Sequence, residues 1–98
     1  MRFRLSRAAE RDLENIGDWI ARDDPDVAAG FTADLAQKAR EIATAPFMYP
    51  SVSGKVDYPL RKRSYRRHII YYRVGRTVVT VVRILRHSRD QGAHVRTP

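Results

Sequence analysis

The chain has 98 residues and no cysteine, which excludes a disulfide framework and a thiolate metal site. Its hydrophobic content of 43% and charged content of 31% are those of a globular protein, and no apolar run has the length of a membrane-spanning helix. The formal net charge is +8, and residues 60–98 carry eleven Lys or Arg and one acid. A positive excess confined to one part of the chain predicts an anionic partner. We expect one soluble, cytoplasmic domain over residues 1–90, followed by a flexible tail over residues 91–98.

The first half of the chain predicts a short strand and two helices. Residues 2–5 alternate charged and apolar side chains, as in a half-buried strand. A helix is expected over residues 7–22, because Ser6 suits its N-cap and apolar residues recur behind it at helical spacing. A second helix is expected over residues 25–43, with Asp24 as its cap. The short break between them predicts a helical hairpin.

The second half predicts a loop and three strands. Residues 44–57 are rich in Pro, Ser and Gly and are interpreted as a loop. The strands are expected at residues 58–63, 66–74 and 77–85. Gly75-Arg76 then forms a two-residue connection, with Gly first as a type II′ hairpin turn requires. The resulting fold is α+β in the order β-α-α-β-β-β, with the helical hairpin packed on one face of a mainly antiparallel sheet.

The predicted turn also fixes which side chains share a face of the sheet, because it places Val74 opposite Thr77. The face that we assign to the helices carries Ile70, Tyr72, Val74, Val79, Val81 and Leu85, with His68 and Arg83 near one end. The second face carries Ile69, Tyr71, Val78, Val82 and Ile84, with Arg67, Arg73 and Thr80. One helical hairpin covers one face, so the second is expected to be an open apolar patch rimmed by arginines, which is typical of an interaction surface. The alternative is that the 44–57 loop folds over it through Phe47, Met48 and Tyr49.

The sequence shows no strong catalytic motif and no metal-ligand spacing. The histidines His68, His87 and His94 are scattered, and His68 is interpreted as a hydrogen-bonded core residue. Acids of the first helix, such as Asp12, are expected on its solvated surface, and Asp18 could pair with an arginine of the sheet. The arginines suit bidentate contact with phosphate or carboxylate.

Three segments of the second half occur in an order that is typical of one family: Leu60-Arg61, HIIYYRV at residues 68–74 and VRILRHSRD at residues 82–90. Behind a strand and a helical hairpin they resemble the RelE/ParE toxin superfamily, and within it the ParE branch, over residues 3–90. The resemblance implies the toxin of a type II toxin-antitoxin module, neutralised by a ParD-like antitoxin that wraps it. Members of the ParE branch inhibit DNA gyrase, whereas RelE-like members cut messenger RNA on the ribosome.

Two positions favour the ParE branch. Ile69 occupies the position where the ribonuclease relatives carry an arginine, and Ser88 lies near the position of their catalytic basic residue. We therefore expect a gyrase inhibitor without catalytic residues, cofactor or metal. A ribosome-dependent mRNA endoribonuclease is the alternative, in which Tyr71 and His87 could act on a proton. A basic nucleic-acid-binding module is the third hypothesis, and direct contact with nucleic acid is left open.

Two surfaces are predicted from this interpretation. The antitoxin is expected on the second face and in the groove beside the helical hairpin, with contacts from Arg67, Ile69, Tyr71, Arg73, Val82 and Ile84. The target is expected at the end of the last strand, with contacts from Arg83, Arg86, His87 and Arg89. No contact with a membrane is expected.

Overall fold

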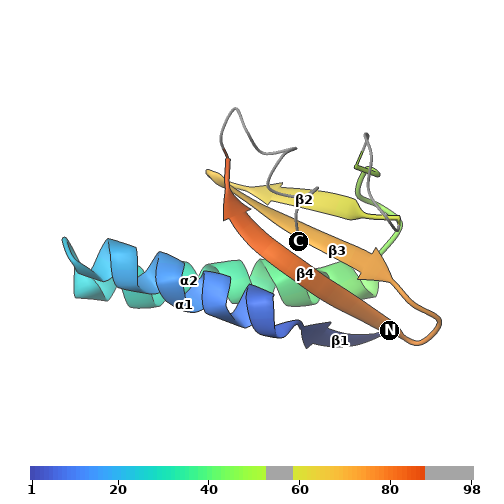
Figure 1. The fold of residues 1–98 in the computed structure, drawn as a ribbon, viewed down its shortest axis with the longest axis horizontal. Coiled ribbons are helices and arrows are strands. Elements are labelled where there is room, and N and C mark those ends of the chain that lie inside the picture. Colours follow the sequence, from blue (N-terminus) through green and yellow to red (C-terminus); the bar gives the residue numbers. More distant parts are fainter. Residues whose placement is uncertain (53–58, 88–98) are drawn as a thin grey trace.

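The computed structural model describes residues 1–52 and 59–87, which form a four-stranded sheet packed against two helices (Figure 1). The elements are β1 (Arg2–Leu5), α1 (Arg7–Ala21), α2 (Pro25–Glu41), the 3-10 turn η1 (Ile42–Thr44), β2 (Arg61–Tyr65), β3 (His68–Val74) and β4 (Val78–Arg86). The predicted α+β fold and its element order are confirmed. The predicted tail over residues 91–98 lies outside the described residues. Within the described ranges no helix combines the length and the apolar character needed to cross a bilayer.

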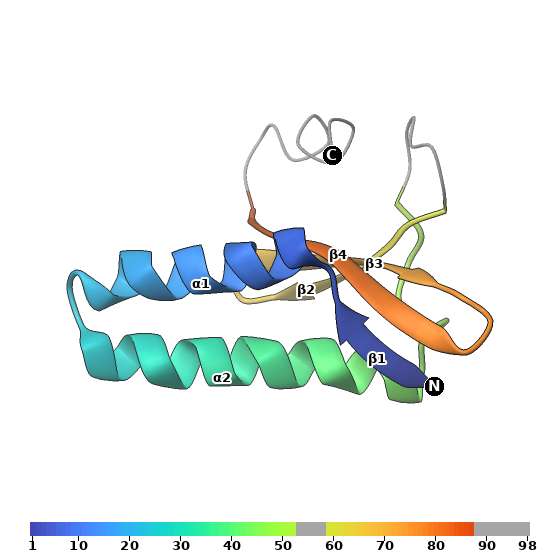
Figure 2. The same cartoon turned by 60° about the horizontal axis from the view of Figure 1, so that its bottom comes forward.

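The two helices begin where the sequence predicts. The Ser6 hydroxyl accepts a hydrogen bond from the Ala9 amide at 3.0 Å, and the Asp24 carboxylate accepts one from the Val27 amide at 3.2 Å. The helices then run side by side in opposite directions, as Figure 2 shows. Gly17 permits this close approach, because a Cβ atom there would lie 3.0 Å from the Thr32 methyl group.

The strands are ordered β1-β4-β3-β2, with β1 parallel to β4 and the other pairs antiparallel. The predicted strand at residues 58–63 is observed at residues 61–65, and the two later strands lie within two residues of their predicted bounds. The chain therefore places its N-terminal strand at one edge of the sheet and β2 at the other.

The connection between β3 and β4 differs from the predicted turn. Val74 lies opposite Val79 rather than Thr77, and the Gly75 amide donates to the Val78 carbonyl at 2.8 Å. Gly75 does not adopt the positive φ of a type II′ turn. Its lack of a side chain matters because an added Cβ would lie 3.0 Å from the Val78 oxygen. The register moves by two residues, so the strand residues nearest the turn keep their predicted faces.

A β-bulge in β4 then reverses part of the face assignment. Tyr72 pairs with Val81 whereas Tyr71 pairs with Arg83, so Val82 is the extra residue. Beyond it Ile84 turns to the helix-facing core and Leu85 to the second face. The predicted positions of these two residues were therefore wrong. A sheet has a side-chain period of two, and one inserted residue exchanges the faces of all that follow.

The bulge lies where the edge of β4 stops pairing with β1 and its backbone groups take other hydrogen-bond partners. β1 ends at Leu5, after which the Ser6 amide donates to the Val81 carbonyl at 2.9 Å and the Ser6 hydroxyl to the Val82 carbonyl at 2.9 Å. The Asp12 carboxylate of α1 accepts from the Ile84 amide at 2.9 Å. Side chains of the α1 segment thus satisfy β4 backbone groups that a longer β1 would have paired.

The core between helices and sheet contains Ala9, Leu35, Ala39, Ile42, Ala43, Ile70, Tyr72, Val79, Val81 and Ile84.

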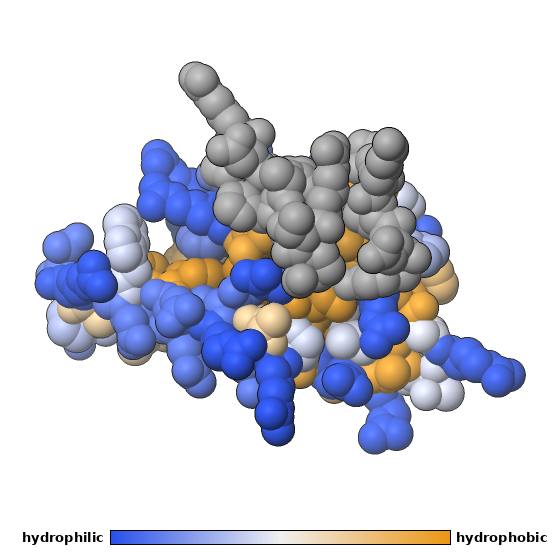
Figure 3. Space-filling model, in the orientation of Figure 1, coloured by the Kyte–Doolittle hydropathy of each residue, from blue (hydrophilic) through white to orange (hydrophobic). Residues whose placement is uncertain are grey.

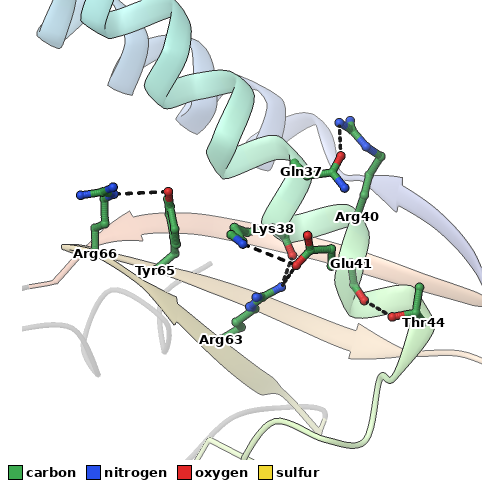
Figure 4. Close-up of polar contacts among 8 residues, drawn as sticks. All are labelled: Gln37, Lys38, Arg40, Glu41, Thr44, Arg63, Tyr65 and Arg66. Carbon is green, nitrogen blue, oxygen red and sulfur yellow. Dashed lines mark hydrogen bonds and ion pairs between the residues drawn. The ribbon is translucent and has the colours of Figure 1, made fainter.

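Hydrogen bonds and an ion pair connect β2 to the end of α2 (Figure 4). Arg63 donates to the Lys38 carbonyl at 2.7 Å and to the Glu41 carboxylate at 3.1 Å. This hydrogen bond is the main reason that the pKa of Glu41 is lowered. The Tyr72 hydroxyl donates to the Pro46 carbonyl at 2.5 Å.

The second face of the sheet is not the open patch that the sequence predicted. Ile69 and Tyr71 are each only 3% exposed and form a cluster with Leu60, which Val52, Val82 and Leu85 extend. The alternative prediction, that the 44–57 loop folds over this face, is correct in part, because Val52 of that loop packs against the cluster. The side chains predicted to do so were wrong, since Phe47 and Met48 are 65% and 68% exposed and Tyr49 packs on the helix-facing core.

Candidate functional site

A groove of about 560 Å³ lies between the helical hairpin and the end of the sheet. Its lining residues are Asn15, Ile16, Trp19, Ile20, Phe31, Arg66, Arg67, His68 and Arg86. Figure 3 shows apolar surface in this region, bordered by hydrophilic side chains. The volume lies in the range of protein sites that bind a small molecule or a few side chains of a partner.

The walls of the groove come from the helices. Ile16 and Ile20 are one helical turn apart on α1, and Trp19 lies beside them. Phe31 of α2 forms the facing wall. The ends of both helices near the α1–α2 connection extend past the sheet (Figure 2). Ile16 and Phe31 still pack against the helix-facing core. Trp19 is 56% exposed, which is unusual for so large an apolar side chain.

Three arginines form the rim of the groove. Tyr65 pairs with His68, so Arg66 and Arg67 make the two-residue turn between β2 and β3. Arg86 comes from the end of β4, with its guanidinium 5.3 Å from the centre of the Trp19 ring. No acidic side chain lines this groove in the described part of the chain. The rim therefore carries a concentrated positive charge beside an apolar surface.

The backbone of Arg66 is strained. Its φ of 54° lies in the left-handed region that glycine tolerates and other residues avoid. The Arg66 Nε donates to the Tyr65 hydroxyl at 3.3 Å, and the guanidinium lies 5.5 Å from the centre of the Tyr65 ring (Figure 4). The hydrogen bond to Tyr65 is the main cause of the raised pKa of Arg66. The strained turn thus holds a cation at the mouth of the groove.

His68 does not fit the predicted hydrogen-bonded core histidine. Its ring centre lies 5.2 Å from that of Phe31, and its Nδ1 is buried without a hydrogen-bond partner among the described residues. Burial lowers the pKa of His68, and the nearby Arg86 lowers it further. The imidazole is therefore neutral at pH 7 and adds an uncharged polar wall to the groove.

The residues predicted to bind the antitoxin are distributed over several places. Arg67 lines the groove, and Arg73, at the far end of β3, lines a smaller cavity beside Phe47 and Leu60. Ile69, Tyr71 and Val82 belong to the cluster on the second face, and Ile84 belongs to the helix-facing core. The structure therefore does not assemble these six residues into one open surface.

The residues predicted to contact the target are also divided. Arg83 donates to the Asp12 carboxylate from Nε at 2.7 Å and from Nη2 at 2.9 Å, which raises its pKa. Asp12, rather than the predicted Asp18, is the helix acid that pairs with a sheet arginine. Arg86 lines the groove, and the exposed His87 donates its backbone amide to the Arg67 carbonyl at 2.7 Å. Arg89 lies outside the described residues. Arg86 and His87 thus meet Arg67 at one rim.

The sequence analysis interpreted the apolar residues of the first helix only as evidence for that helix, and it did not identify Trp19, Phe31 or Arg66 as site residues. Trp19 itself was a signal in the sequence, because a tryptophan that lies beside the apolar stripe of a helix is often a contact residue of an interface. The groove offers apolar walls, arginine donors and a neutral imidazole, which suit binding of an amphipathic segment. In residues 1–52 and 59–87 no group of three His, Asp or Glu is placed to hold a metal ion.

Comparison with known proteins agrees with this fold and with the resemblance of the sequence to the ParE branch of the RelE/ParE superfamily. Residues 3–91 match the family model described as the ParE toxin of the type II toxin-antitoxin system parDE. The chain belongs to the ParE toxin family. The predicted family, and with it the toxin of a type II toxin-antitoxin system, is therefore confirmed.

A solved chain from the chromosomal ParDE toxin-antitoxin system of P. aeruginosa has the same fold as this ParE toxin. The two superpose with a TM-score of 0.75 at 19% sequence identity, over 90% of this chain and 97% of that chain. No curated protein matches the chain. At this identity the likeness extends to the fold, so the partners of this toxin must be argued from its own residues.

Proposed function

We propose that this ParE toxin acts in the cytoplasm by binding DNA gyrase and is neutralised by a ParD-like antitoxin seated in the groove. Family membership supports a module of toxin and antitoxin. The observation that carries the proposal is the groove itself, where the exposed Trp19 and apolar helix walls meet the cationic Arg67 and Arg86. Such a surface suits a protein segment with apolar and acidic side chains.

The target surface that we propose begins at the same rim. Arg86 and His87 are exposed at the end of β4, and Arg89 follows them in the sequence. We do not include Arg83, because its guanidinium is engaged by Asp12. An antitoxin in the groove would cover Arg86, so neutralisation would follow from occupation of part of the target surface.

The ribonuclease alternative is less well supported by the residues. Ile69 stands where ribonuclease relatives carry an arginine, and its side chain is packed against Leu60 and Tyr71. An aliphatic side chain neither holds a phosphate nor stabilises charge that develops on it. Tyr71, a candidate for proton transfer in that alternative, is itself buried. Direct contact with nucleic acid through the other arginines is not needed for the proposal.

Induction of the chain in cells tests the proposal. Inhibition of gyrase predicts DNA breaks and filamentous cells before protein synthesis declines, whereas a ribonuclease predicts early translation arrest with cleaved messages. Arg86→Glu combined with Arg89→Glu should abolish toxicity without unfolding the protein. Arg76→Glu, at the exposed turn between β3 and β4, is the matched control and should remain toxic. Early message cleavage with intact DNA would overturn the proposal.

A further inference from the structure

We infer that the end of the sheet opposite the groove binds a single-stranded nucleic acid, with arginines on its phosphates and one base in a small cavity beside Phe47. This inference goes beyond the proposed function, because neither the groove nor gyrase enters it. It is carried by the separation of charge between the two layers of the fold, the arrangement of arginines across the strands, and the lining of the cavity.

Charge is separated between the two layers. Residues 2–5 and 60–87, which contain the four strands and the turns between them, carry eleven Lys or Arg and no acid. In the described part of the chain every Asp and Glu lies between residues 10 and 41, in the helices and their connection. Two of the sheet cations, Arg63 and Arg83, pair with acids of the helices. A surface so rich in cations attracts a polyanion.

The arginines at this end of the sheet lie at intervals across the second face. Arg4 of β1 is opposite Thr80 of β4, and Thr80 is opposite Arg73 of β3, so the two arginines are two strands, or about 9–10 Å, apart. Arg2 lies two residues from Arg4 on the same side of β1, roughly 6.6 Å away. The residue between the two arginines of the row, Thr80, is buried. Spaced cations of this kind suit repeated phosphates, whereas a protein segment needs an apolar anchor between its charges.

A cavity of about 290 Å³ lies beside this row. Arg73 belongs to the row and also lines the cavity, together with Phe47, Ser51, Leu60 and Arg61. No acid lines the cavity in residues 1–52 and 59–87. The start of β1 and the β3–β4 turn lie at the same end of the sheet, far from the α1–α2 connection (Figure 1). The cavity thus combines two cations, a hydroxyl group and apolar surface, which are the groups that contact a nucleotide.

Phe47 is held as a stacking surface. Its side chain is exposed, and the Arg61 guanidinium lies 5.1 Å from the centre of its ring. Arg61 also donates to the backbone carbonyls of Phe47 at 3.4 Å and of Tyr49 at 2.6 Å, which fixes this segment against β2. Exposed aromatic rings beside cations stack on nucleic acid bases of any sequence. Because a duplex keeps its bases stacked in its interior, the strand that offers a base to Phe47 is single.

Fluorescence anisotropy with the full-length toxin and a labelled oligothymidylate of about twelve nucleotides tests the phosphate contacts. We expect binding whose log affinity falls linearly with log salt concentration. Arg4→Ala should make this slope shallower by about 0.7, the contribution of one phosphate contact on a single strand. Arg22→Ala, an exposed arginine at the α1–α2 connection, is the matched control and should leave the slope unchanged.

Two further variants separate stacking from charge. Phe47 and Met48 are both exposed, so neither substitution should unfold the protein, which circular dichroism would verify. Phe47→Ala should weaken binding about tenfold at fixed salt and leave the salt slope unchanged, because it removes the stacking surface and no charge. Met48→Ala is the control, since Met48 is not among the described residues that line the cavity, and its affinity should stay within twofold of wild type.

An oligouridylate of the same length identifies the kind of strand. Binding of DNA, of RNA or of both supports the inference, and the tighter of the two is the occupant. The inference is overturned if neither strand binds, if a duplex of the same length or polyglutamate binds as tightly at physiological salt, or if the Arg4 and Phe47 variants behave like their controls. Inhibition of gyrase, or its absence, changes none of these outcomes.

Discussion

The contact between Asp12 and β4 should be among the most sensitive polar features of this fold. The carboxylate is only 12% exposed and accepts three hydrogen bonds, two from Arg83 and one from the Ile84 amide. Asp12→Ala would leave the Arg83 charge unpaired and the Ile84 amide unsatisfied. Hydrogen bonds to charged groups contribute about 1.5–3 kcal/mol each, and they are not additive within one cluster. Arg83 is 30% exposed and regains some hydration, so we expect a loss of roughly 2–4 kcal/mol of unfolding free energy.

Urea denaturation and thermal melting would measure this loss. For a domain of this size the expected decrease corresponds to a melting temperature lower by on the order of 10–20 °C. Asp12→Asn keeps one oxygen for the Ile84 amide and should lose about half as much, although it removes the charge and replaces one of the two acceptor oxygens by an NH2 donor. Asp18→Ala, an exposed acid on the same helix, is the matched control and should change stability by less than about 0.5 kcal/mol. The reasoning is refuted if Asp12→Ala is as stable as the control, or if the losses of Asp12→Ala and Arg83→Gln simply add in the double variant.

Three further predictions concern the core and the groove. Tyr72→Phe removes the hydrogen bond to the Pro46 carbonyl and should lower the unfolding free energy by about 1–2 kcal/mol in urea denaturation; an unchanged midpoint would contradict it. Burial lowers the pKa of His68 below 6.5, so as the pH falls this imidazole is protonated in the unfolded chain before it is protonated in the folded protein. The unfolding free energy should therefore decrease below about pH 6.5 more steeply in the wild type than in His68→Gln, when it is measured between pH 5 and 8. Parallel curves for the two proteins would show that His68 does not cause the pH dependence. Arg66→Gly relieves the strained φ but adds unfolded-state entropy, so its stability should stay within about 1 kcal/mol of wild type while antitoxin binding, measured by calorimetry, weakens at least tenfold. Unchanged affinity would assign Arg66 to the turn alone.

The parts of the fold that could be predicted from the sequence are those determined by local chemistry. Ser6 and Asp24 cap the helices that they were expected to cap, because an N-cap depends on residues three positions away. The strands were found because their alternation and β-branched content are properties of short windows. The family could be recognised for a related reason, since its motifs are short segments in a fixed order.

The features that could not be predicted depend on contacts distant in sequence. The bulge at Val82 accompanies a change at the edge of β4, where Ser6 and Asp12 replace β1 as partners. The faces of Ile84 and Leu85 follow from that bulge. The surface predicted for the second face of the sheet was therefore wrong at these two positions. A groove beside the helical hairpin was expected, but its apolar lining was not predicted, because helical spacing does not show that the ends of the hairpin near the α1–α2 connection extend past the sheet (Figure 2).

A supercoiling assay with purified DNA gyrase tests the proposed activity most directly, when it is run beside ribosome-dependent cleavage of a translated message. We predict that the wild-type toxin inhibits supercoiling, that Arg86→Glu with Arg89→Glu does not, and that the message stays intact at matching concentrations. Addition of the antitoxin should restore supercoiling. Efficient cleavage of the message with gyrase unaffected would contradict the proposal and favour a ribonuclease.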